Sequence, residues 1–432
     1  MRVIVLAAVA AAGLAVLFDS AGPALAQGSV NGHWPQWRGP QRDGVSPDMG
    51  LLDAWPAGGP PKLLTVSGVG VGFSSVSIAQ GRIFTMGDLP NGQHVIALDE
   101  AKGQRLWATL VGGRHQDEYG GPRGTPTISG DLIYALGTEG DLVCLEAATG
   151  RVRWRRSLPN DFGGRMMSGW MYSESPLVDG DRVIVTPGGG PAGMVALDRL
   201  TGKEIWRAAI PRLGSAGSDG AGYSSIVISN GAGVKQYVQL MGRGVIGVRA
   251  SDGEFLWGYN RVANNIANIT TPIVRGGQVF ASSSYGTGSV LLTLTAAPGN
   301  RVEAKENYFL DGGTLQNHHG GFVLLNGFLY GGHGQSNGLP VCLELDTGRM
   351  MWTRARGAGS GSAAVTAADG HLYFRYQNGT MALIEANPKQ YTLKSSFDVP
   401  NVRNPSWSHP VITGGRLYLR EQDDLHIYNV RR

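Results

Sequence analysis

The chain has 432 residues, of which 42% are hydrophobic and only 16% are charged, so it holds enough apolar material for a large core. The formal net charge is +4 and the basic residues are scattered rather than clustered, which argues against a nucleic-acid partner. The 67 glycines follow no collagen-like period and indicate frequent tight turns instead.

Residues 1–26 have the features of a secretory signal sequence. Met1 and Arg2 precede an apolar run, and Ala24-Leu25-Ala26 supplies the small residues that a signal peptidase reads. We expect cleavage after Ala26 and a periplasmic or secreted protein. No other segment is long enough to span a bilayer.

Residues 27–60 form a Pro/Gly-rich arm with little periodicity, which contains Trp34-Pro35-Gln36-Trp37-Arg38-Gly39-Pro40. We expect this arm to pack on the rim of the domain that follows. Residues 61–432 are predicted to form that single domain, because one repeated unit runs through them.

The repeated unit is clearest at Val195–Trp206. An apolar strand ends in Asp or Glu, a tight turn with Gly follows, and a second strand carries Trp. The same Trp position recurs 47, 52, 51 and 95 residues apart, and the last gap is two periods, at Trp107, Trp154, Trp206, Trp257 and Trp352. A period of about 40–50 residues built from short strands is typical of propeller blades.

The predicted fold is all-β: an eight-bladed β-propeller of four-stranded antiparallel blades. Tyr308 and Phe397 take the Trp position in the degenerate fifth and seventh repeats. The last repeat has only three strands, whereas Lys62–Val66 is a spare strand. Pairing Lys62–Val66 with Leu425–Val430 would close the ring and remove its open edges. Seven blades remain the alternative if a degenerate repeat is misread.

Two cysteines, Cys144 and Cys342, occupy the same place in two different repeats. By our count they lie four blades apart, too far for a disulfide, which needs Cα atoms within about 7 Å. We expect both to be buried free thiols.

Candidate site residues stand in the loops that precede the inner strands, since these loops converge on the central funnel of a propeller. Glu174 is the candidate general base, because neighbouring aromatic rings could raise its pKa. The loops between second and third strands add Tyr285 and His333. The candidate ligand- or cofactor-binding residues are Tyr119, Arg123, Trp170, Tyr172, Tyr223, Asn265, Asn268, Asn317, His318, His319, Trp407 and His409.

Each of these residues taken singly is explained by loops that satisfy one another's backbone groups. The set as a whole favours a ligand site. Glu174 and the histidines could also hold a transition metal. Adjacent residues such as His318 and His319 seldom point the same way, however, and we assign no metal ligands.

The repeat resembles that of the pyrroloquinoline quinone (PQQ) propeller superfamily over nearly all of the mature chain. Three segments are similar to sequence motifs of exported PQQ-binding-like propellers of bacteria: the arm motif, Gly121–Pro126 and Asn317–Gly321. The superfamily includes quinoprotein alcohol and sugar dehydrogenases, which implies PQQ with calcium, and BamB-type assembly propellers, which carry no cofactor. The adjacent-cysteine disulfide, the calcium-binding carboxylate and the catalytic Asp of the dehydrogenases have no match here.

Three hypotheses follow, and whether the protein is an enzyme stays open. The first is an exported propeller that binds a small molecule or glycan in its funnel, with no established chemistry. The second is a PQQ-dependent alcohol or sugar dehydrogenase. The third is a BamB-like scaffold with a protein partner in the cell envelope.

Overall fold

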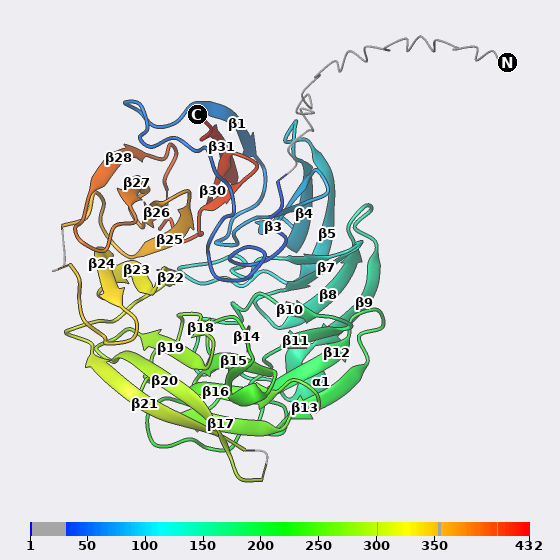
Figure 1. Ribbon diagram of the computed structural model, residues 1–432. Coiled ribbons are helices and arrows are strands. Elements are labelled where there is room, and N and C mark those ends of the chain that lie inside the picture. The colour runs from blue at the N-terminus through cyan, green and yellow to red at the C-terminus, as the bar shows by residue number, and fades with distance from the viewer. Residues whose placement is uncertain (2–31, 300, 353–355, 404) are drawn as a thin grey trace. The chain divides into compact units, whose positions relative to one another are not determined.

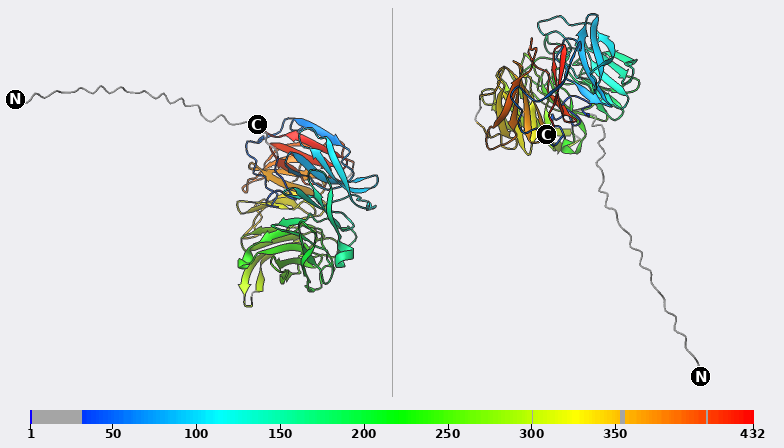
Figure 2. Two further views of the ribbon diagram at one scale, coloured as in Figure 1. Left: turned by 90° about the vertical axis from the view of Figure 1, so that its right-hand side faces the viewer. Right: turned by 90° about the horizontal axis from the view of Figure 1, so that it is seen from above.

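The computed structural model describes Met1 and residues 32–299, 301–352, 356–403 and 405–432. The predicted signal sequence and its cleavage after Ala26 lie outside these residues, apart from Met1. From Gly32 onwards the described chain forms an eight-bladed propeller of antiparallel sheets arranged in a ring (Figure 1; two further views in Figure 2). The predicted fold class is confirmed.

In blades 1 to 7 the strands of each sheet run in chain order from the centre outwards. Blade 1 comprises β2 (Ser77–Ala79), β3 (Arg82–Leu89), β4 (Gly92–Asp99) and β5 (Arg105–Gly112), and blade 2 comprises β6 (Thr127–Ser129), β7 (Leu132–Leu136), β8 (Asp141–Glu146) and β9 (Val152–Ser157). Blade 3 comprises β10 (Leu177–Asp179), β11 (Arg182–Val185), β12 (Met194–Asp198) and β13 (Glu204–Ala208), and blade 4 comprises β14 (Val227–Ser229), β15 (Gln236–Met241), β16 (Gly244–Arg249) and β17 (Phe255–Tyr259).

Blade 5 comprises β18 (Ile273–Arg275), β19 (Gln278–Ser283), β20 (Gly288–Ala297) and β21 (Arg301–Asp311). Blade 6 comprises β22 (Phe322–Leu325), β23 (Phe328–His333) and β24 (Leu339–Glu344). Blade 7 comprises β25 (Ala363–Ala368), β26 (His371–Tyr376), β27 (Thr380–Glu385) and β28 (Leu393–Asp398). Blade 6 shows three strands among the described residues, with a bridge from Leu343 to Met350 beyond them. The helical elements are α1 (Leu158–Phe162) and the 3-10 turn η1 (Gly231–Gly233).

Blade 8 closes the ring in the predicted way. It comprises β29 (Val411–Thr413), β30 (Arg416–Glu421) and β31 (Asp424–Asn429), and β1 (Lys62–Ser67) is its outer strand. In the antiparallel register Val66 lies opposite Leu425 and Lys62 opposite Tyr428. The chain's early strand therefore covers the edge that its last strand would otherwise expose.

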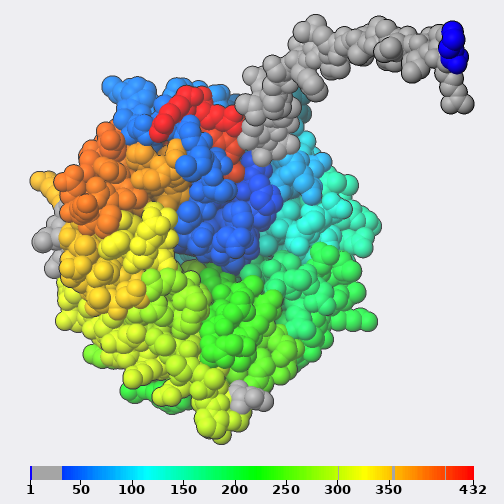
Figure 3. Space-filling model, viewed as in Figure 1, coloured from blue at the N-terminus to red at the C-terminus, as the bar shows by residue number. Residues whose placement is uncertain are grey.

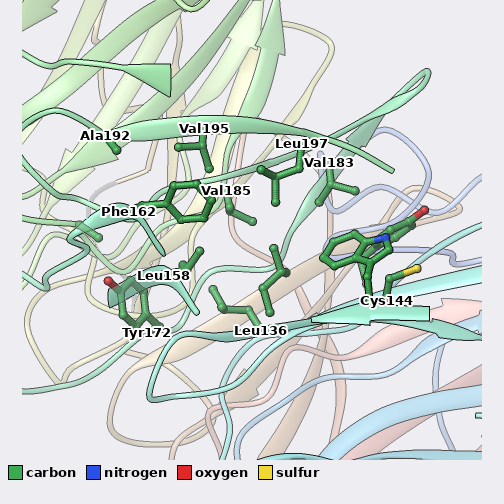
Figure 4. Packing of buried hydrophobic residues seen from close by; sticks show 14 residues of the cluster. Leu136, Cys144, Leu158, Phe162, Tyr172, Val183, Val185, Ala192, Val195 and Leu197 are labelled. Carbon is green, nitrogen blue, oxygen red and sulfur yellow. The ribbon is translucent and has the colours of Figure 1, made fainter. Parts of the chain in front are cut away.

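The hydrophobic core is divided into layers between successive blades. One such layer joins blades 2 and 3, where Leu136 and Cys144 face Val185 and Leu197 (Figure 4). Both cysteines are buried and free, as expected. Burial raises the pKa of each thiol to about 12, so neither is reactive at neutral pH.

In blades 1 to 3 the repeated tryptophan contacts the next blade. The indole N–H of Trp154 in blade 2 donates to the Arg199 carbonyl of blade 3 at 3.0 Å. A Cβ built on Gly202, in the turn of blade 3, would lie 2.7 Å from the Trp154 ring. Gly202 also has φ +68°, a conformation that other residues resist. The glycine therefore lets the turn lie flat on the ring.

The N-terminal arm crosses the centre of the ring instead of staying on the rim. Trp34 pairs with Ile78 of blade 1, and Val45 pairs with Ala367 of blade 7. The arm is the dark-blue segment over the middle of the ring in Figure 3. It binds there because inner strands have a free edge that faces the channel, and the arm's backbone satisfies part of it.

The rim expectation is correct only for the second part of the arm. Leu51 and Trp55 pack into one cluster with Phe397 of blade 7 and Tyr428 of blade 8. This part of the arm covers the aromatic side chain of Phe397, which takes the Trp position in blade 7.

We predict that Gly202→Ala destabilises the propeller more than Gly180→Ala does. Both glycines have positive φ, at +68° and +62°, but a Cβ at Gly180 meets nothing within 4 Å. The Gly180 variant should lose about 1 kcal/mol from backbone strain alone, and the Gly202 variant about 1–3 kcal/mol more from the clash with Trp154. Urea unfolding followed by circular dichroism measures both. Equal losses would contradict the packing role of Gly202.

Candidate functional site

A pocket of about 310 Å³ opens where the loops before the inner strands converge. These loops form its walls, and Trp37 and Arg38 of the arm close its inner end. Eight of the residues proposed from the sequence line it: Tyr119, Arg123, Trp170, Tyr223, His318, His319, Trp407 and His409.

Trp407 is the centre of an aromatic cluster in this pocket. Its ring centroid lies 5.0 Å from that of Phe73, 4.9 Å from Tyr119 and 4.5 Å from His319. The indole N–H donates to the Gln377 side chain at 3.0 Å, which fixes the ring's orientation. Such rings present flat apolar faces to a ligand.

The histidines of the pocket are neutral bases rather than cations. His318 stacks on His319 with centroids 3.6 Å apart, and its two ring nitrogens contact Ser362 and Tyr285 at 2.7 and 2.9 Å. Burial lowers the pKa of His318 to about 4 and that of His319 well below its ordinary value.

His409 is neutral as well, because burial and then Arg38 lower its pKa to about 3. Its Nε2 donates to the His319 carbonyl at 3.3 Å. A carbonyl can only accept, so the proton of the neutral ring is on Nε2 and its Nδ1 carries a lone pair.

Arg123 holds the loop that carries Tyr119. Its guanidinium donates to the backbone carbonyls of Tyr119 at 2.7 Å and Gly121 at 3.3 Å, and lies 3.6 Å from Asp117. Burial lowers the Arg123 pKa, and Asp117 opposes this shift. Arg123 therefore shapes the wall and also brings positive charge to it.

A collar of hydroxyl groups locks the loops of successive blades together. The backbone N–H of Ser75 donates to Thr125, that of Thr125 to Ser175, that of Ser175 to Ser225 and that of Ser225 to Thr271, at 2.9–3.2 Å. Ser175, Ser225 and Thr271 also line the pocket. These bonds hold the loops of successive blades to one another.

Two proposed residues lie in the core instead of the pocket. Glu174 is 2% exposed, and its carboxylate accepts from the backbone N–H and the hydroxyl of Thr186. Tyr172 points into the layer between blades 2 and 3 and donates to the Pro187 carbonyl (Figure 4). Both precede β10 on the chain, but the backbone turns them away from the channel.

The three proposed asparagines do not line the pocket either. Asn268 donates to the carbonyls of Met241 and Gly242, and Asn317 donates to those of Gly321 and Gly332. Their amides are used within the loops, so they are not available for ligand hydroxyls. Asn265 is exposed outside the pocket.

The list of candidates missed several lining residues, which include Trp37, Arg38, Phe73, Ser225, Thr271 and Gln377. Trp37 and Arg38 stand in the arm motif, which we expected on the rim. Tyr285, noted only as a neighbouring loop residue, lines the pocket with φ +58°. A non-glycine residue in this conformation is strained, and such strain often occurs at functional sites.

The pocket does not fit PQQ bound with calcium. Calcium takes six to eight oxygen ligands, usually with carboxylates among them, yet none of the described lining residues is Asp or Glu. Over the described ranges, no group of three or more His, Cys, Asp or Glu side chains could hold a metal. Nor does any helix in this part of the chain have the length and apolarity to cross a bilayer.

Comparison with known proteins gives one family match. The family model described as outer membrane protein assembly factor BamB matches residues 91–354. A curated protein of the same description from Kangiella koreensis is 27% identical over 164 residues, which make up 38% of this chain and 35% of that protein. The chain therefore spans well under half of that relative's length.

Solved structures of two kinds share the architecture. BamB from Moraxella catarrhalis superposes with a TM-score of 0.57 at 14% identity, over 86% of this chain and 99% of that one. Quinohemoprotein alcohol dehydrogenase from Comamonas testosteroni gives 0.61 at 11% identity, over 92% and 80% of the two chains. At these identities the likeness shows the fold alone.

We predict that Glu174→Gln reduces the pH dependence of stability. Burial raises the Glu174 pKa from 4.5 to about 8. Between these values the folded chain keeps a proton that the unfolded chain releases, so stability falls as pH rises. The variant has no such proton and should lose less stability across this window, by on the order of 2–4 kcal/mol.

Urea midpoints measured from pH 4 to pH 9 test this prediction. Glu303→Gln, at an exposed position of β21, is the control and should keep the wild-type profile. Parallel profiles for wild type and Glu174→Gln would show that Glu174 is ionised in the folded protein.

Proposed function

Since the chain belongs to the family described as outer membrane protein assembly factor BamB, we propose that it is an exported propeller that binds a small, ring-bearing molecule in its central pocket. The observation that carries this proposal is the concentration of aromatic rings in one hollow. Seven of the lining residues are Phe, Tyr or Trp, and at most of these positions the ring lies off the structural repeat. Flat aromatic compounds and sugars both stack on such faces.

The pocket favours binding over catalysis. The low pKa values of its histidines make them weak bases, and both ring nitrogens of His318 already have hydrogen-bond partners. Glu174, the candidate general base, lies in the core and does not line the pocket. A general base must come within hydrogen-bond reach of the proton it removes, and no described carboxylate lines this pocket.

A partner protein in the cell envelope is the second candidate function, and the family match supports it. The outer strands also expose apolar side chains, including Leu63, Leu106 and Ile205. Exposed apolar side chains on outer strands are available for protein association. For either function we propose a periplasmic or secreted location, on the strength of the predicted signal sequence.

We expect Trp407→Ala to weaken ligand binding about tenfold, the equivalent of about 1.4 kcal/mol, because it removes the central stacking face. Calorimetry and quenching of Trp fluorescence would be measured with PQQ with and without calcium, with oligosaccharides and with aromatic acids. Leu106→Ala, an exposed change on β5, should leave binding unchanged. If no ring-bearing compound binds the wild type, the pocket function is wrong and the scaffold proposal leads.

A further inference from the structure

The inner end of the pocket holds a buried guanidinium with no carboxylate in direct contact, although the charge of Asp43 lies near enough to raise its pKa. Arg38 is 5% exposed and forms no ion pair with any carboxylate in the described ranges. Its Nη2 donates to the carbonyls of Asp43, at 2.8 Å, and Phe322. A buried charge is costly unless it is paired and fully hydrogen-bonded.

Two other buried arginines of the propeller donate through more than one nitrogen. Arg375 pairs with Glu421 at 2.6 Å and donates to the Ser408 carbonyl. Arg420 donates through all three nitrogens, to acceptors that include the carbonyls of Gln422 and Gly70. A guanidinium has five N–H donors. Since Arg38 donates through Nη2 alone, its other N–H groups can donate to a ligand.

The spare side of Arg38 lies beside the pocket lining. A Cβ on Gly321 would stand 2.8 Å from Arg38 Nη1 and 4.0 Å from the His409 ring. Gly321, His409 and Arg38 all line the pocket. The missing side chain at Gly321 therefore gives the guanidinium its place at the inner end of the pocket.

The charge of the lining has one sign. Arg38 and Arg123 are its cations, its histidines are neutral, and none of the described lining residues is acidic. Burial lowers the Arg38 pKa to about 10, so the group remains charged at neutral pH. In a partly desolvated pocket this charge acts strongly on an anion.

We propose that the ligand of this pocket is a flat aromatic carboxylate whose acid group is bound by Arg38 while its ring stacks on Trp407. This proposal rests on the ring-binding function proposed above and specifies its ligand class. Nη2 already donates to two backbone carbonyls, so Nη1 would donate to the carboxylate, and a hydrogen bond between two charged groups is stronger than one between neutral groups. The residue that would select a carboxylate, Arg38, therefore belongs to the N-terminal arm and not to a blade.

Arg42 offers a matched control within the same arm. It is also 5% exposed and also has positive φ, at 56° against 61° for Arg38. Its guanidinium donates to the carbonyls of Ser175 and Pro176 and does not line the pocket. Replacing either arginine removes a buried positive charge from the arm. Only Arg38→Met removes a positive charge that would contact the ligand.

The test compares 2-naphthoate with its neutral isostere 2-naphthamide by calorimetry, using the mature chain. Wild type and Arg42→Met should bind the acid at least tenfold more tightly than the amide. Arg38→Met should bind both compounds equally, at the affinity of wild type for the amide. Arg38→Lys should restore part of the preference, and circular dichroism checks that each variant is folded.

The outcomes separate this proposal from the proposed function. Binding of the amide without preference for the acid overturns the anion site and leaves the ring-binding function standing. A preference that survives Arg38→Met also overturns the role of Arg38. If neither compound nor any other ring-bearing probe binds the wild type, both proposals are wrong. If Arg38→Met does not fold, a reduced preference for the acid in Arg38→Lys supports the site, and an undiminished preference overturns it.

Discussion

The propeller depends on one recurring contact, in which an aromatic ring of one blade lies against the turn of the next, as at Trp107, Trp154 and Trp206. Trp154 shows both halves of this contact, a hydrogen bond to the Arg199 carbonyl and a close approach to Gly202. Neither blade face is buried without its neighbour, so each contact stabilises two sheets at once. These contacts lie in the outer part of the ring, so the packing of blade on blade does not depend on the loops at its centre. The central loops can therefore carry residues that bind a ligand.

The arm turns an open channel into a closed pocket. A ring of blades alone has a hole along its axis, and the collar of hydroxyl groups from Ser75 to Thr271 fixes the hole's width at one end. Trp37 donates to Thr271 at 3.4 Å, so the arm is tied into that same collar. The chemistry at the inner end of the pocket is therefore set by a segment outside the repeats, which can differ without changing any blade.

The sequence was sufficient for the fold because every blade repeats the same physical signal. The substitutes Tyr308 and Phe397 and the closing strand β1 were also predictable, since period and strand count require them. The site was only partly predictable. Loop position correctly grouped Tyr119 with Trp407, but a residue whose two sequence neighbours line the pocket can face the core, as Glu174 does. The arm carries no period, so nothing in its sequence placed Arg38 at the centre.

The closing strand also sets the order in which the molecule can be completed. β1 leaves a ribosome or a translocation channel long before β31, yet Thr65 and His426 must become neighbours. A contact across so many residues forms late and slowly, because loop-closure entropy is lost before any pairing is gained. Until β31 arrives, β1 has no partner. The last blade therefore acts as a checkpoint, because truncated chains retain an unpaired edge that quality-control proteases and chaperones can recognise.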